Sequence, residues 1–219
     1  IGVAARAGAT VFDADAPLDT QGVPVVALAG TCMDSGKTAA ACAIVGRLRH
    51  LGLHVAACKA TGVSLRRDIL TMEDAGATDT MIFSDLGIVT TTAENGPALT
   101  RALLSGMAES QPDVIVLELG DGLLGAYGVE AILSDAAIRE ALTVVILCAN
   151  DPVSAWGGAK ILRSDFDIEP AVVTGPATDN AVGIDQIRER LSLDAINALS
   201  NGVALGDHVA AVLKDREAA

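Results

Sequence analysis

Apolar residues occur along the chain in short consecutive runs, separated by longer segments in which polar and apolar positions mix. Runs that are apolar at nearly every position are typical of strands buried on both faces of a sheet. These runs predict strands over residues 23–29, 55–59, 113–119, 143–149 and 171–174. The mixed segments predict helices over residues 35–51, 65–75, 94–109, 184–191 and 203–215.

Buried strands that alternate with helices are typical of a parallel sheet covered on both sides. We therefore expect an α/β fold, a three-layer sandwich with a mainly parallel sheet and helices on both faces. The 219 residues suffice for one sizeable domain and are too few for two ordinary ones. We place this domain at residues 23–219 and interpret residues 1–22 as an N-terminal stub or linker, either the tail of an upstream segment or a trimmed start.

The composition limits which residues can build the core and which kinds of molecule the protein can bind. Hydrophobic residues make up 51% of the chain and aromatic residues only 2%, so Ala, Val, Ile and Leu must build the core. The net charge of −13 argues against nucleic acid or an anionic membrane as the main partner, but a small anion can still bind to local basic groups. Four cysteines without C-x-x-C spacing indicate free thiols rather than a zinc site or disulfides, so we expect a cytoplasmic protein.

One loop carries the clearest chemical signal. The first predicted strand is followed by Gly-Thr-Cys-Met-Asp-Ser-Gly-Lys-Thr and then by a helix. This order is typical of a phosphate loop, in which glycine lets the backbone approach a phosphate and the helix N-terminus faces the anion. We expect Lys37 to reach the β- and γ-phosphates and Thr38 to hold Mg²⁺. The predicted nucleotide-binding residues of the loop are Gly30, Thr31, Cys32, Met33, Asp34, Ser35, Gly36, Lys37 and Thr38.

A magnesium–nucleotide site also needs a carboxylate opposite the threonine, and in open α/β sheets such a group comes from the end of a neighbouring strand. Glu118 lies at the end of a predicted strand, where an unpaired acid within an apolar run is costly. Asp68 is a second candidate, and Lys59, at the end of the second strand, is predicted to face the ligand crevice. The alternatives are a partly exposed strand-end acid, a helix-start carboxylate and a surface lysine, respectively.

Other motifs give weaker signals. Residues 120–125 match G-x-G-x-x-G, a pattern of dinucleotide sites, but Gly125 and Gly128 discourage a helix that starts at once. A loop shaped around a substrate, or around the γ-phosphate and metal, fits this segment as well. We interpret Asn150-Asp151-Pro152 as a turn. For the phosphate loop itself, the alternative is a glycine-rich turn capped by Ser35.

Taken together, these motifs resemble the dethiobiotin synthetase-like family of P-loop (SIMIBI-type) ATP-dependent enzymes. The resemblance covers roughly residues 24–162 and is carried by Gly30-Thr31-x4-Gly36-Lys37-Thr38, Lys59-Ala60-Thr61-Gly62, Asp68, and Glu118 before a glycine-rich loop. It implies ATP and Mg²⁺ as cofactors, a small-molecule substrate and a homodimer. In the family, ATP activates a carbamate made from CO₂ and a diamine.

The resemblance also implies roles for individual residues. Lys37 and Lys59 would be catalytic: Lys37 would bind phosphate, and Lys59 would help to hold the transferred phosphoryl group or the carbamate. The implied metal-binding residues are Thr38, Asp68 and Glu118, and the implied substrate residues are Thr61, Gly120, Asp121 and Gly122. In the family the base is bound after a late strand, which here points to Thr174 and Pro176.

The chain departs from the family pattern mainly on the substrate side. The segment that begins at Lys59 is two residues shorter than in the family and lacks its Pro-Val, and Leu119 and Asp121 stand where the family prefers glycine. The nucleotide half of the resemblance is therefore carried over, and the diamine substrate is not.

Three hypotheses about function follow. The first is an ATP- and Mg²⁺-dependent ligase or kinase that activates a small amine or carboxylate. The second is a nucleotide switch like the partitioning ATPases, although those proteins usually carry a lysine at the position of Thr31. The third is the P-loop module of an uncharacterised amino-acid N-acyltransferase-type protein, in which another domain precedes the phosphate loop.

Overall fold

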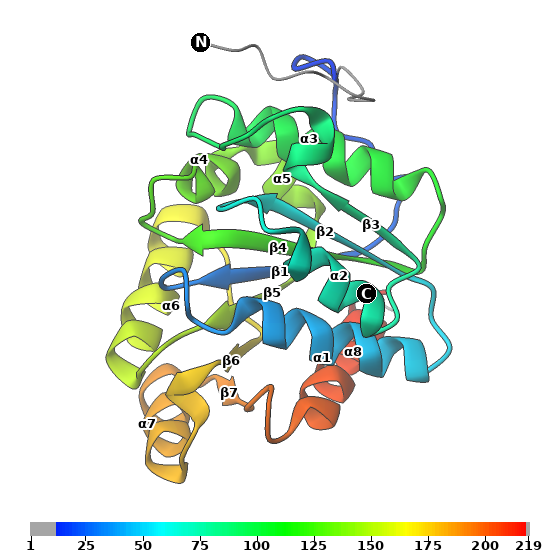
Figure 1. Cartoon of the computed structure of the whole chain (residues 1–219). Helices are drawn as coiled ribbons and strands as arrows, with labels where there is room; N and C mark the ends of the chain where they lie inside the picture. The colour runs from blue at the N-terminus through cyan, green and yellow to red at the C-terminus, as the bar shows by residue number, and fades with distance from the viewer. Residues whose placement is uncertain (1–11, 218–219) are drawn as a thin grey trace.

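A parallel sheet forms the centre of the computed structural model, which describes residues 12–217. Its seven strands follow the order β3-β2-β4-β1-β5-β6-β7, and every pairing is parallel (Figure 1). The strands are β1 (Val25–Gly30), β2 (Val55–Thr61), β3 (Asp79–Ile82), β4 (Val114–Gly122), β5 (Leu142–Cys148), β6 (Val172–Thr174) and β7 (Asp194–Ala195).

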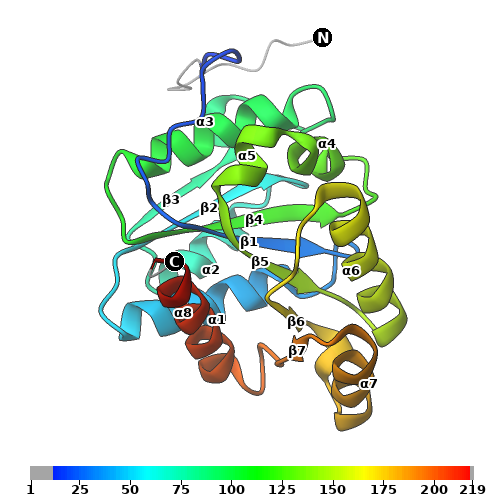
Figure 2. The ribbon, with the colours of Figure 1, turned by 180° about the vertical axis from the view of Figure 1, so that it is seen from behind.

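Helices cover both faces of this sheet, so the expected three-layer α/β fold is confirmed. Helix α1 packs against α2 and α8 on one side, and α3, α4 and α5 pack together on the other (Figures 1 and 2). Helices α6 and α7 pack against each other beside β5 to β7. The helices are α1 (Lys37–His50), α2 (Arg66–Asp74), α3 (Gly96–Ala108), α4 (Val129–Ser134), α5 (Ala136–Ala141), α6 (Pro152–Phe166), α7 (Ala181–Leu191) and α8 (Gly202–Glu217), with short 3₁₀ turns η1 (Phe83–Leu86) and η2 (Pro176–Thr178).

The three central strands β1, β2 and β4 are buried at every position, which agrees with their apolar runs in the sequence. Polar residues in these strands are therefore exceptions that need partners. The register places Lys59 of β2 and Leu28 of β1 on either side of Glu118 in β4. Because all strands run in the same direction, the loops that follow β1, β2 and β4 meet at one edge of the sheet.

The structure corrects several predicted boundaries. Strand β4 continues to Gly122 and β2 to Thr61, so Glu118 and Lys59 lie inside their strands rather than at the ends. The short strands β3 and β7 and the short helices α4 and α5 were not predicted. They have four, two, six and six residues, which is too short for a periodic pattern to emerge.

Helix α6 overturns the interpretation of Asn150-Asp151-Pro152 as a turn. Asp151 caps the helix, since its carboxylate accepts hydrogen bonds from two backbone N–H groups of the first turn, and Pro152 occupies the first helical position. Gly157 and Gly158 within the helix conceal it in the sequence, because glycine lowers helix propensity. The structure uses Gly158 for close packing, since a Cβ there would lie 3.0 Å from Leu147.

Residues 12–22, within the segment interpreted as a stub or linker, run along α3 (Figure 2). The backbone N–H of Asp19 donates to Ser105 Oγ at 3.0 Å, and Arg101 donates to the carbonyl of Ala14 at 2.9 Å. Leu18 packs against the hydrophobic core. Residues 1–11 of that segment lie outside the described residues. Among the helices of the described part of the chain, none combines the length and the hydrophobicity needed to cross a membrane.

Candidate phosphate and metal site

The loop between β1 and α1 leaves the N-terminus of α1 open to an anion. Gly36 has a left-handed φ of 89°, and no side chain within residues 12–217 caps the helix there. Ser35 Oγ donates to the carbonyl of Cys32 at 2.9 Å, so Ser35 closes the loop and does not cap the helix. The first N–H groups of α1 therefore keep the anion-binding capacity of an uncapped helix N-terminus, which is contrary to the alternative of a turn capped by Ser35.

Lys37 folds back over this loop. Its Nζ donates to the carbonyls of Cys32 at 2.7 Å and Met33 at 3.1 Å. Gly30 leaves room for this conformation, because a Cβ there would lie 2.6 Å from Lys37 Nζ. Desolvation by burial lowers the pKa of Lys37, while nearby acidic groups such as Glu118 oppose the shift. The carbonyls of Cys32 and Met33 thus hold the Lys37 ammonium over the loop. Phosphate oxygens of a bound ligand could replace these two carbonyls as acceptors.

Thr31 occupies the position where the usual phosphate loop has glycine, and the structure explains how its side chain is accommodated. Helix α6 passes the loop with Gly158, where a Cβ would lie 3.0 Å from Thr31 Cγ2. Asn150, at the start of the same connection, donates from Nδ2 to Cys32 Sγ at 3.1 Å. The segment after β5 therefore supports the phosphate loop, a role that the sequence interpretation of Asn150 missed.

Four predicted residues meet beside Lys37. Thr38 Oγ1 donates to Glu118 Oε1 at 3.3 Å, and Lys59 Nζ lies 3.9 Å from the same Glu118 oxygen. Lys59 also forms an ion pair with Asp68. Four elements, α1, α2, β2 and β4, thus bring together the hydroxyl, the two carboxylates and the ammonium that the sequence had suggested.

Burial makes this cluster chemically unusual. Lys59 is 4% exposed and Glu118 2% exposed, so neither is the surface residue of the alternative interpretation. Glu118 Oε2 is buried and finds no hydrogen-bond partner among the described residues. Burial raises the pKa of Glu118, and this shift is opposed mainly by the positive charge of Lys59. A buried carboxylate with a spare oxygen is a ready ligand for a hard cation.

The predicted substrate residues are placed at the same edge of the sheet but are engaged within the protein. Thr61 Oγ1 is shared between Thr91 Oγ1, at 2.6 Å, and the carbonyl of Tyr127. Asp121 is buried, and its two carboxylate oxygens accept hydrogen bonds from the N–H groups of Gly122 at 2.7 Å and Tyr127 at 3.0 Å. These contacts order the loop after β4, so a role in substrate binding stays a prediction for Thr61 and Asp121.

Two glycines of this segment allow close packing around the site. A Cβ on Gly120 would lie 2.6 Å from Lys59 Cε, and a Cβ on Gly122 would lie 2.9 Å from the carbonyl of Thr31. The G-x-G-x-x-G segment thus forms a wall of the phosphate loop. The next helix, which was not predicted, begins only at Val129, so no helix starts directly after the segment, in agreement with the effect expected of Gly125 and Gly128.

The turn after β6 closes the other side of the phosphate loop. Gly36 approaches Gly175 so closely that a Cβ on Gly36 would lie 3.3 Å from Gly175 Cα and 3.6 Å from Pro176 Cδ. Thr174 is fully buried, and its Oγ1 finds no hydrogen-bond partner within the residues described here. The two residues predicted to bind the base, Thr174 and Pro176, are therefore adjacent to the loop, while a contact with a base stays a prediction.

We expect Gly175→Ala to destabilise the protein more than Gly52→Ala does. Both glycines have a φ of 92°, which strains an alanine at either position. At Gly175 the ψ of −168° adds to this, because the combination is essentially restricted to glycine and costs another residue about 1–3 kcal/mol. A Cβ on Gly175 would in addition collide with the carbonyl of Ser35 and lie 2.8 Å from that of Ala149. At Gly52, nothing in the described part of the chain lies within 4 Å of a Cβ.

Urea unfolding measures the difference. The clash and the glycine-only backbone conformation of Gly175 together should lower the free energy of unfolding of Gly175→Ala by about 1–3 kcal/mol more than that of Gly52→Ala. Equal values for the two variants would show that the turn after β6 does not press on the phosphate loop.

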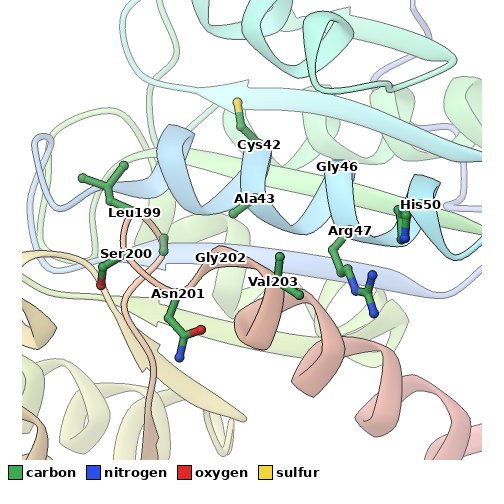
Figure 3. A pocket seen from close by; sticks show the side chains of 11 residues that line it. Cys42, Ala43, Gly46, Arg47, His50, Leu199, Ser200, Asn201, Gly202 and Val203 are labelled. Carbon is green, nitrogen blue, oxygen red and sulfur yellow. The ribbon is translucent and has the colours of Figure 1, made fainter.

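Two hollows lie near these elements. A pocket of about 460 Å³ is bordered by the phosphate loop, the loop after β4 and Asn150, including Thr31, Asp34, Asp121 and Gly125. A second pocket, of about 550 Å³, follows α1 on the side of α8 (Figure 3). It is lined by Ala43, Gly46, Arg47 and residues 198–203, which form the loop before α8 and the start of that helix, and it does not include the charged cluster. The first pocket is the one that lies against the predicted nucleotide-binding loop.

No family model and no curated protein sequence matches the chain. Solved structures do match its fold. A DUF1611 family protein from Anabaena variabilis superposes with a TM-score of 0.63 at 11% identity, over 95% of this chain and 62% of that one. The signal recognition particle receptor FtsY from Elizabethkingia anophelis in complex with GDP gives 0.59 at 14% identity, over 93% and 67%. The hydrogenase maturation factor HypB from Archaeoglobus fulgidus gives 0.56 at 15% identity, over 88% and 91%.

At these identities the likeness concerns the fold alone. The chain has the α/β fold of SIMIBI-type P-loop proteins, as the sequence predicted. This likeness of fold does not single out the dethiobiotin synthetase-like family.

Proposed function

We propose that this chain is a Mg²⁺-dependent module that binds a nucleoside triphosphate and cleaves the bond to its γ-phosphoryl group. One observation carries the proposal. Thr38 and Glu118 meet directly beside the uncapped N-terminus of α1, and the second carboxylate oxygen of Glu118 is buried without a partner in residues 12–217. An anion site and a hard-cation site that share one edge of the sheet suit a magnesium triphosphate.

The donor set fits Mg²⁺. Hydroxyl and carboxylate oxygens are the ligands that Mg²⁺ prefers, and in nucleotide sites it takes its other ligands from phosphate and water. Thr38 and Glu118 would hold the ion, with Asp68 next to them. When bound, the ion would neutralise negative charge on the β- and γ-phosphoryl oxygens.

Other groups of the chain would bind and orient the phosphates. The N–H groups at the start of α1 and the Lys37 ammonium would bind them, once phosphate oxygens replace the carbonyls of Cys32 and Met33. Phosphoryl transfer requires mainly positioning and charge stabilisation from a protein, and a low-dielectric site strengthens both. The burial of Lys37 and Lys59 is consistent with this task.

Titration with fluorescent ATP and GTP analogues tests the proposal. We expect submillimolar binding of at least one of them and at least about tenfold tighter binding with Mg²⁺ than with EDTA, because the ion would bridge the phosphates and Glu118. The sequence resemblance favours ATP, whereas the FtsY structure that shares the fold holds GDP. If neither the ATP analogue nor the GTP analogue binds, with or without Mg²⁺, the proposed function is wrong.

Hydrolysis of the nucleotide could drive either of two functions, a ligase reaction or a nucleotide switch. The dethiobiotin synthetase-like resemblance favours a ligase, but Thr61 and Asp121, which that reading gives to the substrate, form internal hydrogen bonds. This observation and the fold shared with FtsY and HypB favour a nucleotide switch, in which the bound nucleotide sets an association state, including that of a homodimer.

Two measurements separate the switch from the ligase. A switch predicts that a non-hydrolysable triphosphate analogue, and not the diphosphate, changes the sedimentation coefficient. A ligase predicts that phosphate release rises when bicarbonate and one member of a panel of amines are added. The third possibility, a module of a larger acyl-transfer protein, stays a prediction from the sequence resemblance alone.

A further inference from the structure

The charged cluster holds an arrangement that nucleotide binding alone does not explain. The ammonium of Lys59 lies between the carboxylates of Asp68 and Glu118, in an ion pair with the first and 3.9 Å from the second. Its side chain is 5% exposed, and those of Asp68 and Glu118 are 13% and 3% exposed. Water therefore does little to screen these charges from one another.

Lys59 already supplies the positive charge that this acidic pair needs. With both carboxylates ionised, these three groups have one negative charge in excess, and a divalent ion would turn this into an excess of one positive charge. Arg67 Nε also lies 3.7 Å from Asp68 Oδ1, but its side chain is 81% exposed, so water screens its charge. The added ion would lie within a few ångströms of a buried ammonium, and this repulsion opposes metal binding as long as Lys59 stays in place. Triphosphate removes the obstacle, because its oxygens offer the ammonium a second set of partners.

The end of the Lys59 side chain packs beside a glycine, which has no side chain of its own. Gly120 lies against the end of the lysine side chain, where a Cβ would be 2.6 Å from Cε. A larger residue would block this space. Thr61, two residues further along β2, is held by Thr91 and Tyr127, so the strand itself is anchored and the side chain is the part that can move.

We propose that Lys59 is the resident counter-cation of the Asp68–Glu118 pair in the nucleotide-free protein, and that it excludes divalent metal until a triphosphate draws its ammonium away. The inference rests on the proposed function and adds a regulatory step to it. Metal and nucleotide then enter together, and the site does not load with Mg²⁺ alone. In this step Lys59 controls when the metal can bind, through its charge, and it does not itself contact the metal.

Binding of Mn²⁺ alone, measured by electron paramagnetic resonance without nucleotide, tests this exclusion. Lys59→Met should bind Mn²⁺ at least about tenfold more tightly than the wild type, because the repelling charge is gone. Adding Asp68→Asn to Lys59→Met should reverse the gain. Lys160→Met is the matched control, since it removes an exposed lysine on α6. No gain in Lys59→Met, or an equal gain in Lys160→Met, would overturn the inference.

A second measurement uses the wild-type protein and does not depend on the folding of Lys59→Met. The Nζ resonance of Lys59 in protein labelled with ¹⁵N at lysine can be assigned by its absence from Lys59→Arg. It should shift when Mg²⁺ and a non-hydrolysable triphosphate are added together and stay in place with Mg²⁺ alone. If the triphosphate binds and the resonance does not move, the exchange is wrong while the proposed function stands. If neither nucleotide analogue binds at all, the proposed function is wrong, and the inference that rests on it is wrong as well.

Discussion

Replacing Lys37 by alanine should weaken the binding of the magnesium triphosphate by about 100-fold, which corresponds to about 2.7 kcal/mol. The lysine follows the left-handed Gly36 at the start of α1, and its ammonium lies over the phosphate loop. The variant loses charge-assisted hydrogen bonds to phosphate in a site where burial strengthens them. Titration with the fluorescent triphosphate measures the effect directly.

Two comparisons make the result for Lys37→Ala specific. Lys160→Ala removes an exposed lysine on α6 and should leave the affinity unchanged. Circular dichroism and a thermal melt establish that Lys37→Ala still folds, which is necessary because Lys37 also holds the carbonyls of Cys32 and Met33. A folded Lys37→Ala protein with wild-type affinity would contradict the assignment of the phosphate loop.

Glu118→Gln should abolish most of the Mg²⁺ dependence and slow phosphate release by at least about 100-fold, the loss expected when a metal ligand that stabilises transferring charge is neutralised. Glutamine keeps the size and one acceptor oxygen, so Thr38 can still donate to it as it does to Glu118 at 3.3 Å. The effect therefore reports the lost charge rather than lost packing. Phosphate release at several Mg²⁺ concentrations is the measurement.

The same substitution should leave the stability of the metal-free protein unchanged or higher at neutral pH. Burial raises the pKa of Glu118 above its ordinary value, so the folded state disfavours the ionised carboxylate. The stability that comes with the protonated form is present below the ordinary pKa and is lost as pH rises through the raised one. Glutamine does not ionise, so the stability of Glu118→Gln relative to wild type should increase over this pH window.

Urea unfolding at a series of pH values checks this sign. A marked loss of stability in Glu118→Gln at neutral pH would mean that the attraction between the ionised carboxylate and Lys59 outweighs the cost of burying the charge, contrary to this prediction. Lys59 keeps its ion pair with Asp68 in this variant, so we expect the fold to survive.

Most of the central sheet was predictable because its signal is local. Strands β1, β2 and β4 are buried throughout, and a strand buried on both faces must be apolar at nearly every position, which is visible in any short window. Helix α1 was equally clear between the phosphate loop and Gly52. Helix α6 was not predicted, because the use of Gly158 is a close approach to Thr31 and Leu147, which are remote from it in sequence.

The candidate site also has a part that the sequence predicts and a part that it does not. The loop from Gly30 to Thr38 is one continuous segment whose glycines, lysine and threonine imply their chemistry by spacing alone. The support that this loop receives from Asn150 and Gly175 had no comparable signal, since each residue acts through one contact across the crevice. The internal hydrogen bonds of Thr61 were equally invisible, because its partners Thr91 and Tyr127 come from remote parts of the chain. Those of Asp121 lie within residues 121–127 but depend on the conformation of that loop, for which the sequence has no periodic signal.

By itself, the sequence determined the alternation of buried strands and helices, the phosphate loop and the types of charged residue around it. Only the tertiary structure decided that Lys59, Asp68 and Glu118 form one buried cluster next to Thr38. The reason is physical. Backbone conformation and hydrophobic periodicity depend on neighbouring residues, whereas the register of β2 on β4 and the position of α2 depend on how the whole core packs.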